Sequence, residues 1–136
     1  DCPYEECIKA PLAIRYPKLI TPGSVSDKFV LNIDLPVTIA DLAGAIPTNS
    51  VNGKSLVPLF SNPEDPTWRS DFLFEHNQFI YGVRQGSYKY VEYNNGDKEF
   101  YDLVSDPYEL TSQHNNPAYT SVINVLRTRL LELKAE

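Results

Sequence analysis

The stretch from residue 71 to residue 104 constrains the fold most, because short aromatic and β-branched segments follow one another there with turn signals between them. Gln85-Gly86 supplies one hairpin turn, and the Asn-Gly pair of NNGD favours a type I′ turn in another. Alternation of polar and apolar residues is moderate, as in a sheet with one covered face. The sequence therefore predicts four antiparallel strands, in the segments DFLFEH, FIYGVR, SYKYVEY and EFYDLV.

The end of the chain predicts a helix that covers this sheet. Asn116 can cap a helix, and Pro117 suits its first turn. Over residues 117–134 we expect the helix to pack one apolar stripe on the sheet, with partner binding as the alternative. The stripe consists of Tyr119, Val122, Ile123, Leu126, Leu130 and Leu133.

The first half of the chain predicts less regular structure. PLAIRY, residues 11–16, is typical of a short buried strand ended by Pro17, and a second short strand is expected near residues 28–31. Pro36 in a first turn and Gly44 at an end predict a helix from about residue 34 to residue 43. Residues 45–70 are rich in proline and turn signals, so we expect a connector with a short helical turn at SLVPLF.

Composition excludes several classes of protein. The net charge of −6, with no basic run, argues against nucleic-acid binding, which needs clustered Lys and Arg. The apolar runs are too short to span a bilayer, there is no signal-peptide pattern, and the absence of Met suggests a piece of a longer product.

The two cysteines, Cys2 and Cys7, are too few for a zinc site, and their spacing excludes a redox CxxC motif. We expect free or structural thiols, with a disulfide and a metal site as alternatives. Two cysteines do not determine the redox compartment.

A collinear series of short segments gives the chain a resemblance to the sulfatases of the alkaline-phosphatase superfamily. The series resembles their C-terminal portion, and most of all that of glycan sulfatases such as the glucosamine-6-sulfatase group. One departure is Asn52, where the family's DGxSL turn has Asp. The segments are Tyr4–Leu12, Asn32–Leu35, Thr38–Gly44, Asn52–Leu56, Trp68-Arg69, Glu75-His76, Val83–Tyr90, Glu99–Leu103 and Asp106–Leu110.

The resemblance implies an α+β fold: a small four-stranded antiparallel sheet packed by a long C-terminal helix, preceded by a strand-helix remnant of an α/β sulfatase catalytic domain. Residues 1–44 would be the end of that catalytic domain and residues 45–70 a connector. Residues 71–136 would be the C-terminal subdomain.

Sulfatases hydrolyse sulfate esters with a formylglycine nucleophile and a calcium ion. Neither Cys2 nor Cys7 fits the family's C/S-x-P-x-R motif, and the family's metal-ligand loops are not found. The resemblance therefore implies no catalytic and no metal-ligating residue in this chain. Formylglycine and calcium are expected in the full-length enzyme only, and the isolated chain is expected to be inactive, contributing cleft shape and stability.

Three residues are candidates for substrate binding. His76 and Asn77 directly follow a predicted strand, where side chains can project towards the cleft. Arg84 could pair with a carboxylate or sulfate, although an ion pair with Glu92 or Asp102 is the more ordinary expectation.

The resemblance implies as partners the N-terminal catalytic half of the same protein and a sulfated small molecule or glycan, with no nucleic acid and no membrane. Self-association through an exposed strand 11–16 is a further expectation. Alternatives are a non-catalytic module that binds glycans or a protein, or the same portion of a phosphonate or phosphodiester hydrolase. The family implies an exported protein, but the chain itself leaves the compartment open.

Overall fold

The computed structural model describes residues 2–46 and 50–135, so residues 47–49 of the predicted connector lie outside the described part. The chain forms two compact units, residues 1–12 with 70–136 and residues 13–69, which are described separately. The predicted domain boundaries near residues 44 and 70 refer to a longer protein and remain a prediction. Within the described ranges, no helix is long and apolar enough to cross a membrane.

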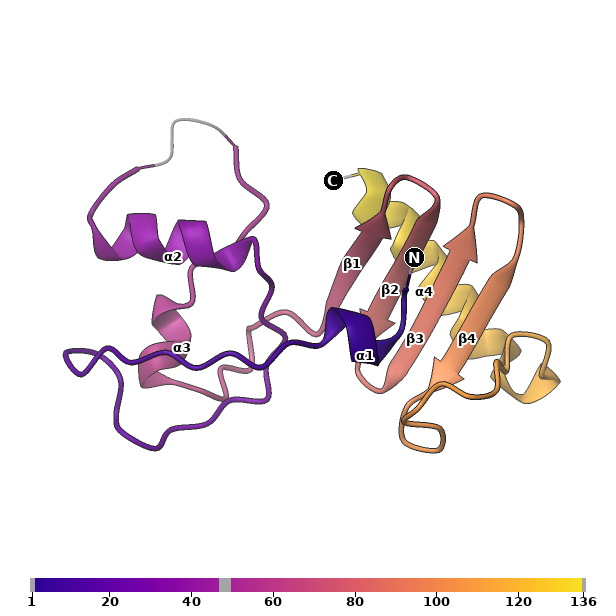
Figure 1. Cartoon of the computed structure of the whole chain (residues 1–136), viewed down its shortest axis with the longest axis horizontal. Coiled ribbons are helices and arrows are strands. Elements are labelled where there is room, and N and C mark those ends of the chain that lie inside the picture. The colour runs from indigo at the N-terminus through magenta and orange to yellow at the C-terminus, as the bar shows by residue number, and fades with distance from the viewer. Residues whose placement is uncertain (1, 47–49, 136) are drawn as a thin grey trace. The chain divides into compact units, whose positions relative to one another are not determined.

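The first unit contains the predicted sheet. Its strands form an antiparallel meander in the order β1-β2-β3-β4, as Figure 1 shows. Leu73 pairs with Val83, which pairs with Tyr90, and Tyr90 pairs with Phe100, so these four side chains share one face. The fold class is thereby confirmed. The strand bounds are β1 Asp71–His76, β2 Ile80–Gln85, β3 Tyr88–Tyr93 and β4 Lys98–Asp102.

The predicted C-terminal helix covers that face. It begins with a 3-10 turn, η1 (Pro117–Tyr119), and continues as α4 (Thr120–Ala135), behind the sheet in Figure 1. Asn116 caps it as predicted, because its side-chain oxygen accepts a hydrogen bond of 3.0 Å from the N–H of Ala118. The core between helix and sheet is fully buried and consists of Val83, Tyr90, Phe100, Leu126 and Leu130.

The opposite face of the sheet is covered in part by the start of the chain. A single helical turn, α1 (Glu5–Ile8), lies over this face in Figure 1, and Cys2 and Cys7 at its two sides form a disulfide. The prediction of free thiols is therefore wrong. The helical turn folds the chain back, so that the two Cα atoms lie 6.0 Å apart, within the range that a disulfide spans.

The hairpin turns differ in part from the prediction. In the NNGD loop Gly96 has a φ of 94°, whereas the positive φ values of described non-glycine residues occur elsewhere, so a type I′ turn at Asn95-Gly96 is wrong. The pattern of that turn occurs instead between β1 and β2, where Asn77 and Gln78 have φ values of 50° and 60°. Gly86, at a φ of 54°, makes the turn between β2 and β3 as expected.

The second unit contains two helices, α2 (Asp34–Leu42) and α3 (Val57–Ser61), close to their predicted positions. Its small core consists of Leu56, Leu59, Phe60 and Trp68, all buried. The predicted strands at residues 11–16 and near 28–31 are wrong, since the described chain forms neither. A strand needs a hydrogen-bonded neighbour, and Leu12 and Ile14 are 50% and 40% exposed with none beside them. The self-association expected through strand 11–16 loses its basis.

Candidate functional site

A buried ion-pair network joins three separate segments of the first unit. Nζ of Lys89 lies 2.6 Å from Oε1 of Glu109 and 3.2 Å from Oε1 of Glu5. The other Glu109 oxygen accepts a hydrogen bond of 2.6 Å from the N–H of Glu5. The side chains of Lys89 and Glu109 are 0% and 1% exposed. Because a buried charge is costly unless paired, this network holds α1 and the loop after β4 on the sheet.

Arg84 belongs to the same network. Its Nε lies 3.4 Å from Oε1 of Glu5, and Nη1 donates to the carbonyl oxygen of Gly86. The predicted partners Glu92 and Asp102 are wrong, because alternation along the strands places them on the face that α4 covers. This geometry supports a structural role for Arg84, and its predicted contact with substrate remains a prediction.

The second unit is organised around one buried carboxylate. Asp34, which is 0% exposed, accepts hydrogen bonds from Nη1 and Nη2 of Arg69 at 2.6 and 2.8 Å. The backbone N–H groups of Leu31 and Lys54 each donate to it at 2.8 Å. Burial acts to raise the pKa of Asp34, but these hydrogen bonds outweigh burial and hold that pKa below its ordinary value.

The two ionic clusters explain the segments that carried the sulfatase resemblance. Glu5, Lys89 and Glu109 come from the segments YEE, GSYKY and DPYEL. Asp34 and Arg69 come from NID and WR. The family signature in this chain therefore consists of residues that hold the fold together.

The candidate substrate residues lie at one end of the sheet. His76 ends β1 and is half-buried, whereas Asn77 is exposed in the turn that follows. Nδ2 of Asn77 donates to Nε2 of His76 at 3.0 Å, which leaves the proton of a neutral His76 ring on Nδ1. The structure brings these two residues together, away from the buried network that contains Arg84.

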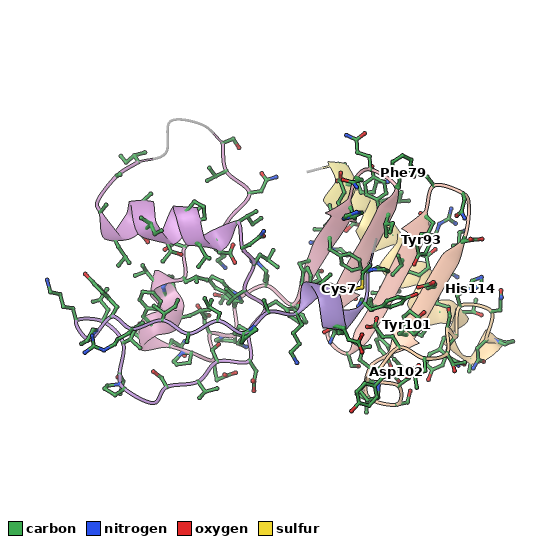
Figure 2. The ribbon with its side chains drawn as sticks, viewed as in Figure 1. Cys7, Phe79, Tyr93, Tyr101, Asp102 and His114 are labelled. Carbon is green, nitrogen blue, oxygen red and sulfur yellow. A yellow bond between two sulfur atoms is a disulfide. The ribbon has the colours of Figure 1, made fainter. Side chains whose placement is uncertain are left out.

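A neighbouring turn supports this end of the sheet. The N–H of Asn94 donates to the carbonyl oxygen of Phe79 at 2.9 Å, and its side-chain amide donates to that of Gln78. The ring of Phe79 is 61% exposed and lies at the end of the sheet in Figure 2. We call the segment His76–Phe79 the β1–β2 turn. An imidazole, an amide and an aromatic ring are thus presented together on a braced turn, a feature that the sequence analysis recognised only for His76 and Asn77.

A tyrosine cluster lies further along the face that α1 covers, where Figure 2 labels Tyr93 and Tyr101. The hydroxyls of Tyr4 and Tyr101 donate to Glu99 at 3.5 and 3.1 Å. Burial, followed by the negative charge of Glu99, raises the pKa of Tyr93 and of Tyr101. These phenols therefore stay protonated as hydrogen-bond donors, and they attach the start of the chain to β4.

The described residues do not fit a calcium site. No group of three or more His, Cys, Asp or Glu side chains that could hold a metal ion occurs in ranges 2–46 and 50–135. Cys2 and Cys7 are joined to each other and so cannot supply a formylglycine.

A four-stranded meander with one covering helix, preceded by a helical unit built on a buried Asp–Arg pair, defines the C-terminal part of a sulfatase-type domain. The family model described as N-sulphoglucosamine sulphohydrolase, C-terminal, matches residues 2–136. The chain belongs to this family.

Similar proteins agree with this assignment. An N-acetylglucosamine-6-O-sulfatase of Bacteroides thetaiotaomicron is 34% identical over 130 residues, which cover 85% of this chain and 23% of that protein. The human N-acetylglucosamine-6-sulfatase is 43% identical over 74 residues, which cover 54% of this chain and 13% of that protein. The chain therefore spans about a quarter or less of the length of these relatives.

Solved structures show the same arrangement. A protein solved in complex with its substrate D-glucosamine-2-N,6-O-disulfate matches 97% of this chain and 29% of its own, with a TM-score of 0.87 and 30% identity. The phosphonate monoester hydrolase of Agrobacterium radiobacter matches 79% of this chain and 25% of its own, with a TM-score of 0.67 and 28% identity.

Proposed function

We propose that this chain is the C-terminal part of a sulfatase that hydrolyses sulfate esters on a glucosamine-containing glycan. The observation that carries the proposal is the match over 97% of the chain to a protein bound to a disulfated glucosamine. The names of the bacterial and human relatives support the same substrate class. Formylglycine and calcium would be supplied by the rest of the polypeptide, since the described residues of this chain hold neither a suitable cysteine nor a metal-ligand group.

The chain would contribute to the substrate cleft through the β1–β2 turn. Asn77 and His76 offer hydrogen-bonding groups of the kind that bind sugar hydroxyls and sulfate oxygens. The exposed ring of Phe79 offers an apolar face beside them. Asn94 holds the turn in place without the binding of ligand, which lowers the entropy lost when a sugar binds.

The disulfide supports an oxidising compartment. Such bonds persist in exported and lysosomal proteins and are rare where glutathione keeps thiols reduced. We therefore place the full-length protein outside the cytosol, as the sulfatase resemblance implied.

Kinetics of the full-length enzyme test the proposal. His76→Ala and Asn77→Ala should each raise KM for a 6-O-sulfated glucosamine substrate roughly tenfold, the loss of about one good hydrogen bond, with a smaller change in kcat. His114→Ala is the matched control, because His114 is also half-buried and lies in the loop before η1. Unchanged KM for both variants, or an equal change for the control, would exclude the β1–β2 turn from the cleft.

The same assay separates the second candidate function. The similarity to a phosphonate monoester hydrolase favours a related enzyme that cleaves phosphonate monoesters. Turnover of a phosphonate monoester by the full-length enzyme, without turnover of sulfate esters, would replace the sulfatase proposal. The isolated chain should hydrolyse neither substrate.

A further inference from the structure

Helix α2 turns its polar side inwards and its apolar side outwards. The residues that it buries are Asp34 and Thr38, at 0% and 5% exposure. Leu35, Ile39 and Leu42 are 36%, 68% and 38% exposed. Their spacing of four and then three residues places these three side chains on one line along the helix, which we call the α2 stripe.

This orientation is imposed by bonds on the inner side. Asp34 is bound by both terminal guanidinium nitrogens of Arg69. Oγ1 of Thr38 accepts a hydrogen bond of 2.9 Å from the N–H of Leu56. Rotating α2 to bury its apolar side would break these bonds and expose charges that are now paired, so the α2 stripe stays outwards as long as the unit is folded.

An exposed aliphatic stripe of this kind usually marks an interaction surface. The stripe itself carries no charged residue. Ile33, just before α2, and Ile46, after it, are 44% and 89% exposed and extend the apolar character of this segment. The surface thus fits an uncharged aliphatic partner rather than a charged ligand.

We infer that the α2 stripe is the docking surface for the remainder of the same polypeptide. This inference rests on the proposed function, according to which the chain is the C-terminal part of a longer enzyme. The matched relatives extend far beyond it, since the chain covers 23% of the bacterial sulfatase and 29% of the solved glucosamine-disulfate complex.

A second copy of the chain is a poorer occupant for the α2 stripe. The helix has nine residues, so it is about 14 Å long at 1.5 Å per residue. A stable dimer buries about 1,200–2,000 Å², far more than one side of so short a helix offers. A larger domain of the same polypeptide, tethered by the chain, needs no such area because its effective concentration is high.

Thermal unfolding of the full-length protein tests the inference without any assay of sulfatase activity. Ile39→Glu should lower the Tm by roughly 5 °C or more, because it would bury an unpaired charge at the interface. In the isolated chain Ile39 is 68% exposed, so the same substitution should leave the Tm unchanged within about 1 °C. If the Ile39→Glu protein fails to fold, Ile39→Ala should still show a smaller loss in the full-length protein only.

Val125→Glu is the matched control, since Val125 is 60% exposed on another helix, α4. It should leave the Tm of the full-length protein unchanged, and a loss equal to that of Ile39→Glu would overturn the inference. An unchanged Tm for both Ile39 variants in the full-length protein would also overturn it. So would a dimer of the isolated chain that Ile39→Glu dissociates, because the second copy would then be the occupant. A normal Tm pattern without sulfatase turnover would reject the proposed function alone.

Discussion

Nζ of Lys89 lies 2.6 Å from Oε1 of Glu109, and both side chains are excluded from solvent. Glu109 has a φ of 56°, a left-handed backbone conformation that is uncommon outside glycine. The ion pair and the hydrogen bond from the N–H of Glu5 hold it there. Three segments that lie far apart in the sequence are thus attached to one another by a single lysine.

We predict that Lys89→Met lowers the free energy of unfolding by about 3–5 kcal/mol, because Glu5 and Glu109 would lose the cation that pairs them. Adding Glu109→Gln should recover part of the loss, since one unpaired charge is then removed. Lys98→Met on the neighbouring strand β4 is the control, and should cost less than about 1 kcal/mol. Urea unfolding measures all three, and equal effects of Lys89→Met and Lys98→Met would contradict a structural role for the network.

The lowered pKa of Asp34 leads to a second prediction. Because the folded pKa is below the unfolded one, the stabilisation from this ion pair is complete above about pH 4 and is lost as the pH falls through the folded pKa. Asp34→Asn should therefore destabilise the protein by about 3 kcal/mol at pH 7 and flatten the acid limb of the stability curve. The exposed Asp27, changed to Asn, should leave that limb as it is. Chemical unfolding between about pH 2 and 7 is the measurement, and a wild-type curve for Asp34→Asn would disprove the assignment.

The disulfide gives a third prediction. The intact mass of unreduced protein should be lower by two hydrogens than that of the reduced protein. Closing so short a loop should stabilise the fold by about 2 kcal/mol, so Cys7→Ser should lose about that amount. Reduction of the wild type should reproduce the loss, and reduction of Cys7→Ser should change nothing more. Two free thiols in the unreduced, denatured protein would show that the bond does not form.

Sequence patterns predicted the sheet and α4 well, because both depend on local regularity. The alternation through Tyr88 and Tyr90 and the helical spacing from Tyr119 to Leu130 each have a single structural solution within this chain. The helix α2 was also predicted from its spacing. Its orientation was not, because an apolar periodicity shows that a side faces something without showing what lies there.

The errors share a physical cause. PLAIRY resembles a buried strand, but a strand depends on neighbours that local sequence does not reveal. Arg84 was assigned partners from adjacent strands, whereas its carboxylate comes from Glu5, which lies 79 positions earlier in the sequence. The disulfide depends on one helical turn between the cysteines, and spacing alone does not predict that turn. Exposure of Phe79 beside His76 depends on a turn conformation that its residues do not favour.

Gly53 provides the last prediction. A Cβ atom at this position would overlap the backbone carbonyl of Ile33 and the side chain of Val37. The carbonyl cannot easily move, because the hydrogen bonds of Asp34, the next residue, hold the start of α2 in place. Gly53→Ala should therefore cost about 1–3 kcal/mol through overpacking, whereas Asn52→Ala, an exposed neighbour, should change stability by less than about 0.5 kcal/mol. Urea unfolding compares the two, and equal stability would mean that the segment around Gly53 can move away from α2.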